Sequence, residues 1–356
     1  RLIPYVVPPE EITPGVSTWY ATVNGDSDDG YGLWVRTREG RVVLLEGNPN
    51  HPVNAGALGA RDHAALQQLY NPDRFTGPQR RVGGQLQPIG WDEAEQLLAD
   101  QIRSAGGNVL MMHGAAGPSM SALMDAFTGA VGGRHLRFDP MLDVPLLEAA
   151  RIAFGAGAVP HYDIGQARFL LSFGADFLDA WGSSVANTRG FTAMHAVDSH
   201  GSKGHFVFIG PRLSLSGQNA DEWLPIQPGS EALVALAMAN VIARRTGNAG
   251  PYASLLSAYD PQAAAAASGI AAEQIEELAG RFMDDGPGLA VGPGIQGQHS
   301  AATAANLAVL VLNSVAGAVG RTLHVRTDGA TGTGQAGMMT ALRQTSGGVV
   351  MVRGVN

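Results

Sequence analysis

The fold is decided by Phe169–Asp176, which reads FLLSFGAD. Four of its first five residues are apolar and they do not alternate with polar residues, as is typical of a strand buried on both faces of a parallel sheet. A glycine and an aspartate follow at the point where such a strand ends. Further apolar strands are predicted along the chain at Val109–Met112, His205–Gly210, Gly288–Val291 and Val349–Val352.

Predicted helices separate these strands. The clearest is Gly90–Gly107, GWDEAEQLLADQIRSAGG, which has acidic residues in its first turn and glycines after its last. Alternating strands and helices predict an α/β fold with doubly wound parallel sheets. Because 356 residues exceed the usual size of one hydrophobic core, we expect at least two domains.

The composition excludes several classes of protein. The chain has no cysteine, which excludes disulfides, thiolate zinc sites and cysteine-ligated iron–sulfur clusters. Its net charge is −8 and it has no basic stripe, so nucleic-acid binding is not expected. The longest apolar run, 306–320, contains polar residues and glycines and is shorter than the ~20 residues that span a bilayer, so no direct membrane span is expected.

The loop in VNGDSDDGYGLWV, Val23–Val35, has the composition of a calcium loop but not its pattern. Asn24, Asp26 and Asp28 fit ligand positions. However, Asp29 stands where the glycine is needed, and Val35 stands where the bidentate glutamate is needed. A solvated turn is the better interpretation.

Two further motifs have both a functional and a structural interpretation. Gly292–Gly297, GPGIQG, follows a strand as a phosphate loop does, but no acidic residue lies about twenty positions on, so a tight crossover explains it equally well. Asp176 and Asp179 follow one predicted strand and Asp221 follows another, where open α/β sheets bind ligands. Carboxylates that cap helix N-termini are the commoner case.

Longer segments together carry a resemblance to one family. They are PYVVPPEEITPGVSTWYATV (4–23), GLWVRTREGRVVLLEGNPNHPVN (32–54), GALGARDHAALQQLYNPDR (56–74), GADFLDAWGSSVA (174–186) and RLSLSGQNADEWLPIQPGSEALVALA (212–237). These segments resemble the molybdopterin-oxidoreductase-like half of the iron–sulfur B subunit of bacterial alternative complex III. The resemblance spans nearly the whole chain.

The resemblance implies a molybdopterin-oxidoreductase-like fold with a small N-terminal β-rich domain and without the C-terminal β-barrel lid. It also implies a domain plan, in which Gly288–Val291 pairs in the same sheet as Val109–Met112. The expected parts are an extended arm (1–16), a degenerate iron–sulfur-type β domain (17–75), a discontinuous α/β domain (76–155 plus 286–356) and an inserted Rossmann-like α/β domain (156–285).

The same resemblance implies that a [4Fe–4S] cluster has been lost. In relatives that carry the cluster, its four ligands correspond to Asn24, Ser27, Tyr31 and Gly59, and none of these is a thiolate. The segment that supplies the molybdenum ligand corresponds to 138–155, where no Cys or Ser stands and Asp139 and Asp143 remain. We therefore expect no metal, no catalytic residue and no cofactor on this chain.

The resemblance finally implies a function and partners. The chain would be a non-catalytic structural subunit or domain of a membrane-associated, quinol-oxidising complex of a respiratory or photosynthetic chain, on the extracytoplasmic (periplasmic) face of the bacterial inner membrane. Its expected partners are a ferredoxin-like iron–sulfur domain or subunit, a multihaem cytochrome c subunit and quinol-binding integral membrane subunits, with the iron–sulfur clusters and haem c on these partners.

Two alternatives stay open. The first is a molybdenum or tungsten bis-pterin oxidoreductase that lacks the N-terminal cluster, with Asp143 as metal ligand. Its candidate cofactor contacts follow predicted strands at Gly174, Asp176, Gly210, Arg212 and Asp221. The second alternative is a nucleotide or small-molecule binding module that uses Gly292–Gly297 on a phosphate.

Overall fold

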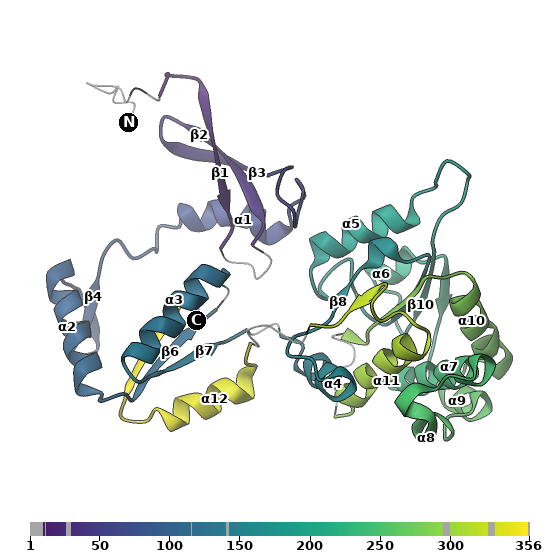
Figure 1. Ribbon diagram of the computed structural model, residues 1–356. Coiled ribbons are helices and arrows are strands. Elements are labelled where there is room, and N and C mark those ends of the chain that lie inside the picture. The colour runs from purple at the N-terminus through teal and green to yellow at the C-terminus, as the bar shows by residue number, and fades with distance from the viewer. Residues whose placement is uncertain are drawn as a thin grey trace. The chain divides into compact units, whose positions relative to one another are not determined.

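The computed structural model describes residues 10, 12–25, 30–114, 116–139, 142–294, 300–326 and 332–354, with the side chain of Pro118 left aside. The chain divides into two compact units. Unit 1 comprises residues 1–142 and 332–356, and unit 2 comprises residues 143–331 (Figure 1). In the described part of the chain, we find no helix with the length and apolar character needed to cross a membrane.

Unit 1 begins with an antiparallel three-stranded sheet, β1 (Ser17–Val23), β2 (Gly32–Arg38) and β3 (Arg41–Gly47). Glu39 and Gly40 both have positive φ between β2 and β3, as a tight hairpin turn requires. Helix α1 (Ala60–Leu69) contacts β3. A second hairpin, β4 (Gln79–Val82) and β5 (Gln85–Pro88), precedes α2 (Trp91–Ser104).

The rest of unit 1 is a parallel sheet with the order β14-β6-β7. Its strands are β6 (Val109–His113), β7 (Arg134–Arg137) and β14 (Val349–Arg353), and its helices are α3 (Pro118–Ala130) and α12 (Gln335–Gln344). Arg134 bonds to α12, whereas the next residue, His135, bonds to Asp125 on α3. Because neighbouring strand residues point to opposite faces, α3 and α12 cover opposite faces of this sheet (Figure 1).

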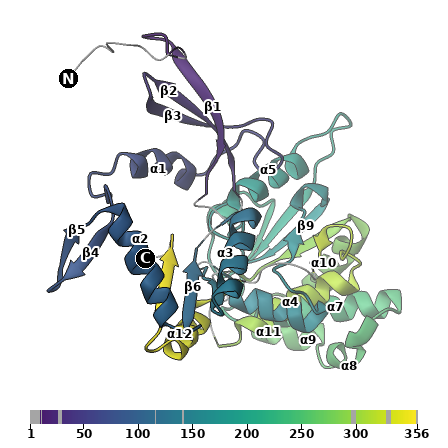
Figure 2. The same cartoon turned by 60° about the vertical axis from the view of Figure 1, so that its left-hand side comes forward.

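Unit 2 is built on a parallel sheet with the order β11-β10-β9-β12. Figure 2 labels β9 of this sheet. Its strands are β9 (Phe169–Phe173), β10 (His205–Ile209), β11 (Glu222–Leu224) and β12 (Gly288–Val291), and a two-stranded sheet pairs β8 (His161–Tyr162) with β13 (Leu323–His324). Its helices are α4 (Val144–Phe154), α5 (Ser184–His195), α6 (Leu215–Gln218), α7 (Glu231–Thr246), α8 (Ala253–Leu256), α9 (Pro261–Ser268), α10 (Ala272–Asp284) and α11 (Ala302–Val315), with two 3-10 turns at Ile164–Gln166 and Gly250–Tyr252.

Alternate residues of the unit 2 strands belong to two separate cores. Phe169 and Leu171 of β9 pack with α7 and α10, whereas Leu170 between them packs with α4 and α5. Helix α11 contributes to both cores and lies next to β12. There the side chain of Asn313, which is fully buried, bonds both the N–H and the C=O of Ala290 at the sheet edge. The predicted α/β fold with parallel sheets covered on both faces is therefore confirmed, and none of the described sheets closes into a barrel.

The predicted pairing of Gly288–Val291 with Val109–Met112 is wrong. Strand β12 pairs with β9 in unit 2, and β6 pairs instead with β14 and β7 in unit 1. The units also divide the chain at residues 143 and 331, not at 156 and 285 as we expected. The physical reason is that short apolar strands are interchangeable in composition. The partner of β12 is set by the core it shares with α11, which the strand sequence itself does not encode.

Candidate functional site

The candidate site lies at the carboxyl edge of the unit 2 sheet. From β9 the chain continues to β10 on one side, while β12 pairs on the other side of β9. The strand order therefore reverses next to β9, and open α/β sheets bind ligands in the crevice at such a reversal. The loops that leave this edge begin with Gly174 after β9, Gly210 after β10 and Gly292 after β12.

These glycines form a floor of backbone atoms. A Cβ atom on Gly292 would lie 2.7 Å from the carbonyl oxygen of Phe173, and one on Gly210 would lie 3.6 Å from the Cα atom of Gly174. Gly174 and Gly292 also have positive φ, which side-chain-bearing residues rarely adopt. All three glycines are buried, so this edge is close-packed backbone with no room for a side chain at these positions. We call Gly174, Gly210 and Gly292 the glycine cradle.

Beside the cradle, charged and polar side chains join the loop that follows β9 to the segment that follows β10. The Arg212 guanidinium donates to the Asp176 carboxylate over 3.0 Å, and the Arg212 side chain is 67% exposed. The hydroxyl of Ser216 accepts a hydrogen bond from the backbone N–H of Leu178 over 3.1 Å. Arg212 is therefore held at one end by Asp176 while most of its surface remains available to an anion. Asp179 lies exposed one turn further along the first loop.

Asp221 does not belong to this edge, which corrects the prediction from the sequence. It precedes β11, and its carboxylate accepts a hydrogen bond from the backbone N–H of Phe206 near the start of β10. Since β10 and β11 are parallel, the chain must return to the amino edge between them, and Asp221 ends that return. The sequence of β11 is too short to mark where the strand begins.

At the amino edge, Asp221 belongs to a network of charges. Its carboxylate accepts hydrogen bonds from His195 (2.9 Å) and from Lys203, while His205 donates to Glu222 over 2.7 Å. Burial raises the pKa of Asp221, but the bonds from Lys203, Phe206 and His195 outweigh burial and lower that pKa to about 2. The ionised carboxylate thus fixes the connection between β10 and β11.

The parallel sheet of unit 1 has a basic carboxyl edge that the sequence did not reveal. His113 ends β6, and its register partners are Arg137 at the end of β7 and Arg353 at the end of β14. The His113 ring is fully buried and stacks on His135 with 4.7 Å between the ring centroids. Residues so far apart in the chain meet only through strand register, so no local motif could have predicted this edge.

Each ring of this stack is fixed at one nitrogen. Nδ1 of His113 donates to the carbonyl of Gly114 over 2.6 Å, and Nδ1 of His135 bonds to Asp125 on α3 over 2.5 Å. Burial lowers the pKa of His113, the bond to Gly114 opposes this, and the nearby charges of His135, Arg137 and Arg353 lower that pKa further. His113 is therefore a neutral ring between two cations.

The positions assigned to the lost cluster are filled by a polar network. Asn24 and Tyr31 are buried, and Ser27 lies outside the described residues. The carboxylate of Asp62, which is 2% exposed, accepts hydrogen bonds from the Asn24 side chain (2.7 Å) and from the backbone N–H of Gly59 (2.9 Å). One carboxylate on α1 therefore joins two of the four positions that the resemblance assigns to cluster ligands.

The two aspartates considered for a metal lie in different units. Asp139 is in unit 1, and Asp143 is the first residue of unit 2. The Asp143 carboxylate caps α4 by accepting from the N–H of Leu146 over 3.0 Å, and burial raises its pKa. Within the described residues no group of three His, Cys, Asp or Glu side chains could hold a metal ion. Of Gly292–Gly297, only 292–294 lie within the described residues, and 26–29 of the calcium-like loop lie outside them.

Comparison with models of protein families shows to which family this chain belongs. The model of the molybdopterin oxidoreductase family matches residues 74–349. This chain belongs to the molybdopterin oxidoreductase family. The resemblance seen in the sequence is confirmed at this level.

Individual relatives agree with that assignment. A protein named menaquinone reductase, molybdopterin-binding-like subunit, from Nitratidesulfovibrio vulgaris is 31% identical over 317 residues, which cover 86% of this chain and 45% of that protein. The molybdopterin-containing subunit of the arsenate respiratory reductase of Shewanella sp. strain ANA-3 is 28% identical over 251 residues, covering 64% of this chain and 28% of that subunit.

The solved structure of acetylene hydratase from Pelobacter acetylenicus shares the fold, with a TM-score of 0.68 at 17% identity over 86% of this chain and 44% of that one. This chain thus spans less than half the length of each of these relatives.

The expectation that the chain carries no cofactor is contradicted by these relatives. The family is defined by molybdopterin, and a subunit similar to this chain is named as molybdopterin-containing. The carboxyl edge of unit 2 fits the nucleotide part of such a group in one respect, because the exposed Arg212 supplies a positive charge where the loops leave the parallel strands. Asp176 pairs with Arg212, whereas Asp221 lies at the amino edge of the sheet and does not contribute to this site.

Proposed function

We propose that this chain is the pterin-nucleotide-binding part of a subunit in a membrane-associated, quinone-linked electron-transfer complex. The observation that carries the proposal is the glycine cradle with Arg212 beside it, on a chain 31% identical to a menaquinone reductase subunit. The loops that begin at Gly174, Gly210 and Gly292 would receive the phosphates, and Arg212 would neutralise them. A bound molybdenum–pterin group supplies the redox chemistry that no cysteine-free side-chain set provides.

The roles of the chain's own residues follow from their contacts. Asp176 orients Arg212 through the 3.0 Å ion pair, and the exposed remainder of the guanidinium would donate to a phosphate oxygen. Ser216 ties the Arg212 loop to the Asp176 loop through Leu178 and thus keeps the two sides of the site at a fixed separation. These residues bind and orient; none of them needs to transfer a proton.

The larger assembly is also part of the proposal. We assign the complex to the alternative complex III type on the sequence segments quoted above, with a ferredoxin-like iron–sulfur partner, a multihaem cytochrome c partner and quinol-binding membrane subunits, on the periplasmic face of the inner membrane. The quinone reaction then takes place on the membrane partners. The menaquinone named in the relative from Nitratidesulfovibrio vulgaris supports a quinone-linked role.

The decisive experiment measures pterin and molybdenum in the protein purified from its native membranes. Pterin is released by oxidation of the denatured protein and read by fluorescence, beside a molybdenum assay. We expect pterin in the wild type and a loss of most of it in Arg212→Gln. The matched control is Arg245→Gln, which removes an exposed arginine paired with Asp284 on the far side of unit 2 from the cradle loops. A wild-type protein free of pterin would refute the proposal, and a guanine nucleotide without pterin would favour a nucleotide-binding module instead.

The partner assignment has its own test. An affinity tag on this chain should retrieve from solubilised membranes a polypeptide that stains for covalently bound haem and a fraction with an iron–sulfur electron paramagnetic resonance signal. Retrieval of the chain without either redox partner would overturn the assignment to alternative complex III while leaving the pterin proposal untouched.

A further inference from the structure

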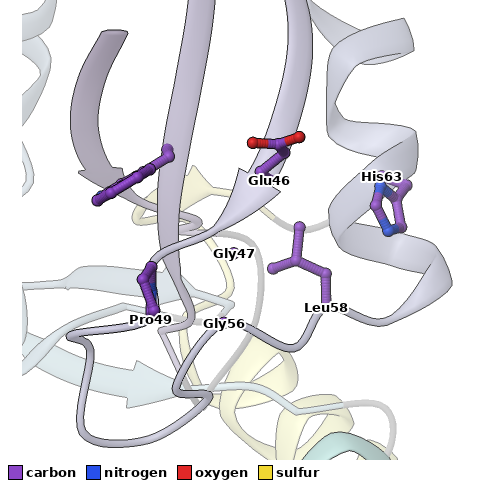
Figure 3. Close-up of a pocket in the computed structure, with 7 residues that line it drawn as sticks. Glu46, Gly47, Pro49, Gly56, Leu58 and His63 are labelled. Carbon is purple, nitrogen blue, oxygen red and sulfur yellow. The ribbon is translucent and has the colours of Figure 1, made fainter.

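Unit 1 contains a pocket that is not lined by any residue of the sheet edges described above. It has a volume of about 470 Å³ and lies beside the N-terminal antiparallel sheet. Glu46 on β3, Pro49 and Leu58 on the following loop and His63 on α1 surround it (Figure 3), and Trp34 on β2 completes its wall. All of these residues lie between positions 34 and 63, so the pocket belongs to one small part of the fold.

The floor of the pocket is rigid backbone. A Cβ atom on Gly47 would lie 2.3 Å from the carbonyl oxygen of Gly56, so the end of β3 and the loop are in direct contact there. The loop that contains Gly56 is fixed by Asn54, which is fully buried. The Asn54 side chain bonds the N–H and C=O of Gly32 and the C=O of Ala57. The pocket is therefore formed before any ligand arrives, which reduces the entropic cost of binding.

The chemistry of the pocket comes from an aromatic ring next to a carboxylate. Trp34 and Glu46 stand directly opposite each other on the paired strands β2 and β3, which places their side chains on the same face of the sheet. Trp34 is 38% exposed, and the Glu46 carboxylate has no hydrogen bond or ion pair to any residue that the structure describes. An indole face beside an ionised carboxylate attracts an organic cation.

The arginines of this domain that stack on aromatic rings do so elsewhere. Arg36 lies over the ring of Trp19 at 5.7 Å, and Arg41 lies over the ring of Tyr70 at 4.9 Å. Within the described part of the chain no cation lies over Trp34, although it alone of these three rings has a glutamate as its cross-strand partner. The pocket thus has both groups that recognise a guanidinium and lacks the guanidinium itself.

We propose that this pocket binds an arginine side chain of a partner protein, with the guanidinium stacked on Trp34 and paired with Glu46. Arginine fits better than lysine because its planar group stacks on an aromatic face and pairs with a carboxylate at the same time. The net charge of −8 on this chain favours a basic partner surface. The site does not depend on the pterin proposal, because no residue of the glycine cradle contributes to it.

The first test uses N-acetyl-arginine amide as the probe and the indole N–H resonance of Trp34, assigned with Trp34→Phe, as the readout. N-acetyl-citrulline amide is the matched probe, since it keeps the shape of the guanidinium and removes its charge. We expect saturable shifts of the Trp34 resonance with the arginine probe and about tenfold weaker binding of the citrulline probe. Equal affinities for the two probes, or shifts that leave Trp34 unaffected, would overturn the proposal.

The second test uses variants of the pocket. Glu46→Gln should weaken the arginine probe about threefold, as expected for loss of one exposed ion pair. The control is Glu95→Gln, which changes an exposed glutamate on α2 without a described ion pair and should leave the affinity unchanged. Thermal unfolding of both variants shows that they are folded. If both glutamine variants bind the probe as the wild type does, Glu46 is not part of a cation site.

The third test addresses the source of the arginine in the intact assembly. Glu46→Arg introduces a like charge into the pocket and should reduce recovery of the partner subunits with the tagged chain, whereas Glu95→Arg should not. Undiminished recovery with Glu46→Arg would exclude a partner arginine at this site. Because pterin content is measured on the same samples, failure of this proposal is distinguishable from failure of the pterin proposal.

Discussion

Replacing Asp62 by alanine should loosen the N-terminal sheet and α1 together. The Asp62 carboxylate is 2% exposed and accepts two hydrogen bonds, one from the Asn24 side chain at 2.7 Å and one from the N–H of Gly59 at 2.9 Å. Asp62→Ala leaves both donors without their acceptor.

The magnitude follows from the burial of the two donors. The Asn24 amide is in a residue only 7% exposed, so losing its acceptor costs about 1–3 kcal/mol. The Gly59 N–H belongs to the capping box of α1, whose loss costs about 1 kcal/mol because water reaches this partly buried group. The sum is about 2–4 kcal/mol, or about a 30- to 1,000-fold rise in the local opening equilibrium.

Hydrogen exchange read by mass spectrometry measures this opening locally, which matters because a chain of two units need not unfold in one step. Peptides within 17–47 should exchange faster in Asp62→Ala, and peptides within 169–209 should not change. Asp62→Asn should have an intermediate effect, since its carbonyl oxygen can still accept from Gly59. Asp73→Ala, at an exposed position after α1, is the control. Unchanged exchange within 17–47 would refute the view that Asp62 holds these positions together.

Three further predictions concern unit 2. The pKa of Asp221 is lowered from 3.8 to about 2, so its ionised carboxylate stabilises the folded state by about 2 kcal/mol. This stabilisation is complete above pH ~4 and is lost as the pH falls towards 2. Urea denaturation at several pH values should therefore show a smaller loss of stability in acid for Asp221→Asn than for the wild type. Asn313→Leu strips both backbone groups of Ala290 of their partners and should lower the free energy of unfolding by about 2–4 kcal/mol, whereas Thr246→Val at an exposed helix end should change it by less than about 1. Gly292→Ala places a Cβ atom 2.7 Å from the carbonyl oxygen of Phe173 and should lower the melting temperature. The control is Gly229→Ala, which also has positive φ but has no atom within 4 Å of the added Cβ, and it should lower the melting temperature less. Equal effects of the two substitutions would show that backbone strain alone matters.

The sequence was sufficient to place the apolar strands of the two parallel sheets, because each of them is a continuous apolar run. Phe169–Phe173 and Gly288–Val291 are strands with the bounds that we predicted, and Val109–Met112 is extended by one residue. Helix α1 begins at Ala60, since Gly59 is its N-cap and the Gly59 N–H bonds back to Asp62. Local signals of this kind are carried by neighbouring residues and can therefore be read without a structure.

Pairing and edge position could not be predicted in this way. The partner of Gly288–Val291 depends on a shared core with α11, and the basic edge around His113 depends on the register of three strands from distant parts of the chain. Asp221 was assigned to the wrong edge because the three-residue strand β11 has no apolar run to announce it. Of the candidate contacts, the structure therefore brings together Gly174, Gly210, Asp176 and Arg212 and separates Asp221 from them.

The N-terminal hairpin is held together by polar contacts at positions that the family resemblance assigns to cluster ligands. A metal cluster joins four points of the chain through one centre, and here Asp62 joins two of those points by hydrogen bonds. Asn54 then ties the neighbouring loop to β2 at Gly32. That loop is the wall of the pocket beside Trp34 and Glu46. The polar network that stabilises the hairpin therefore also holds the loop that lines the pocket, so the shape of the hairpin and the shape of the pocket depend on the same hydrogen bonds.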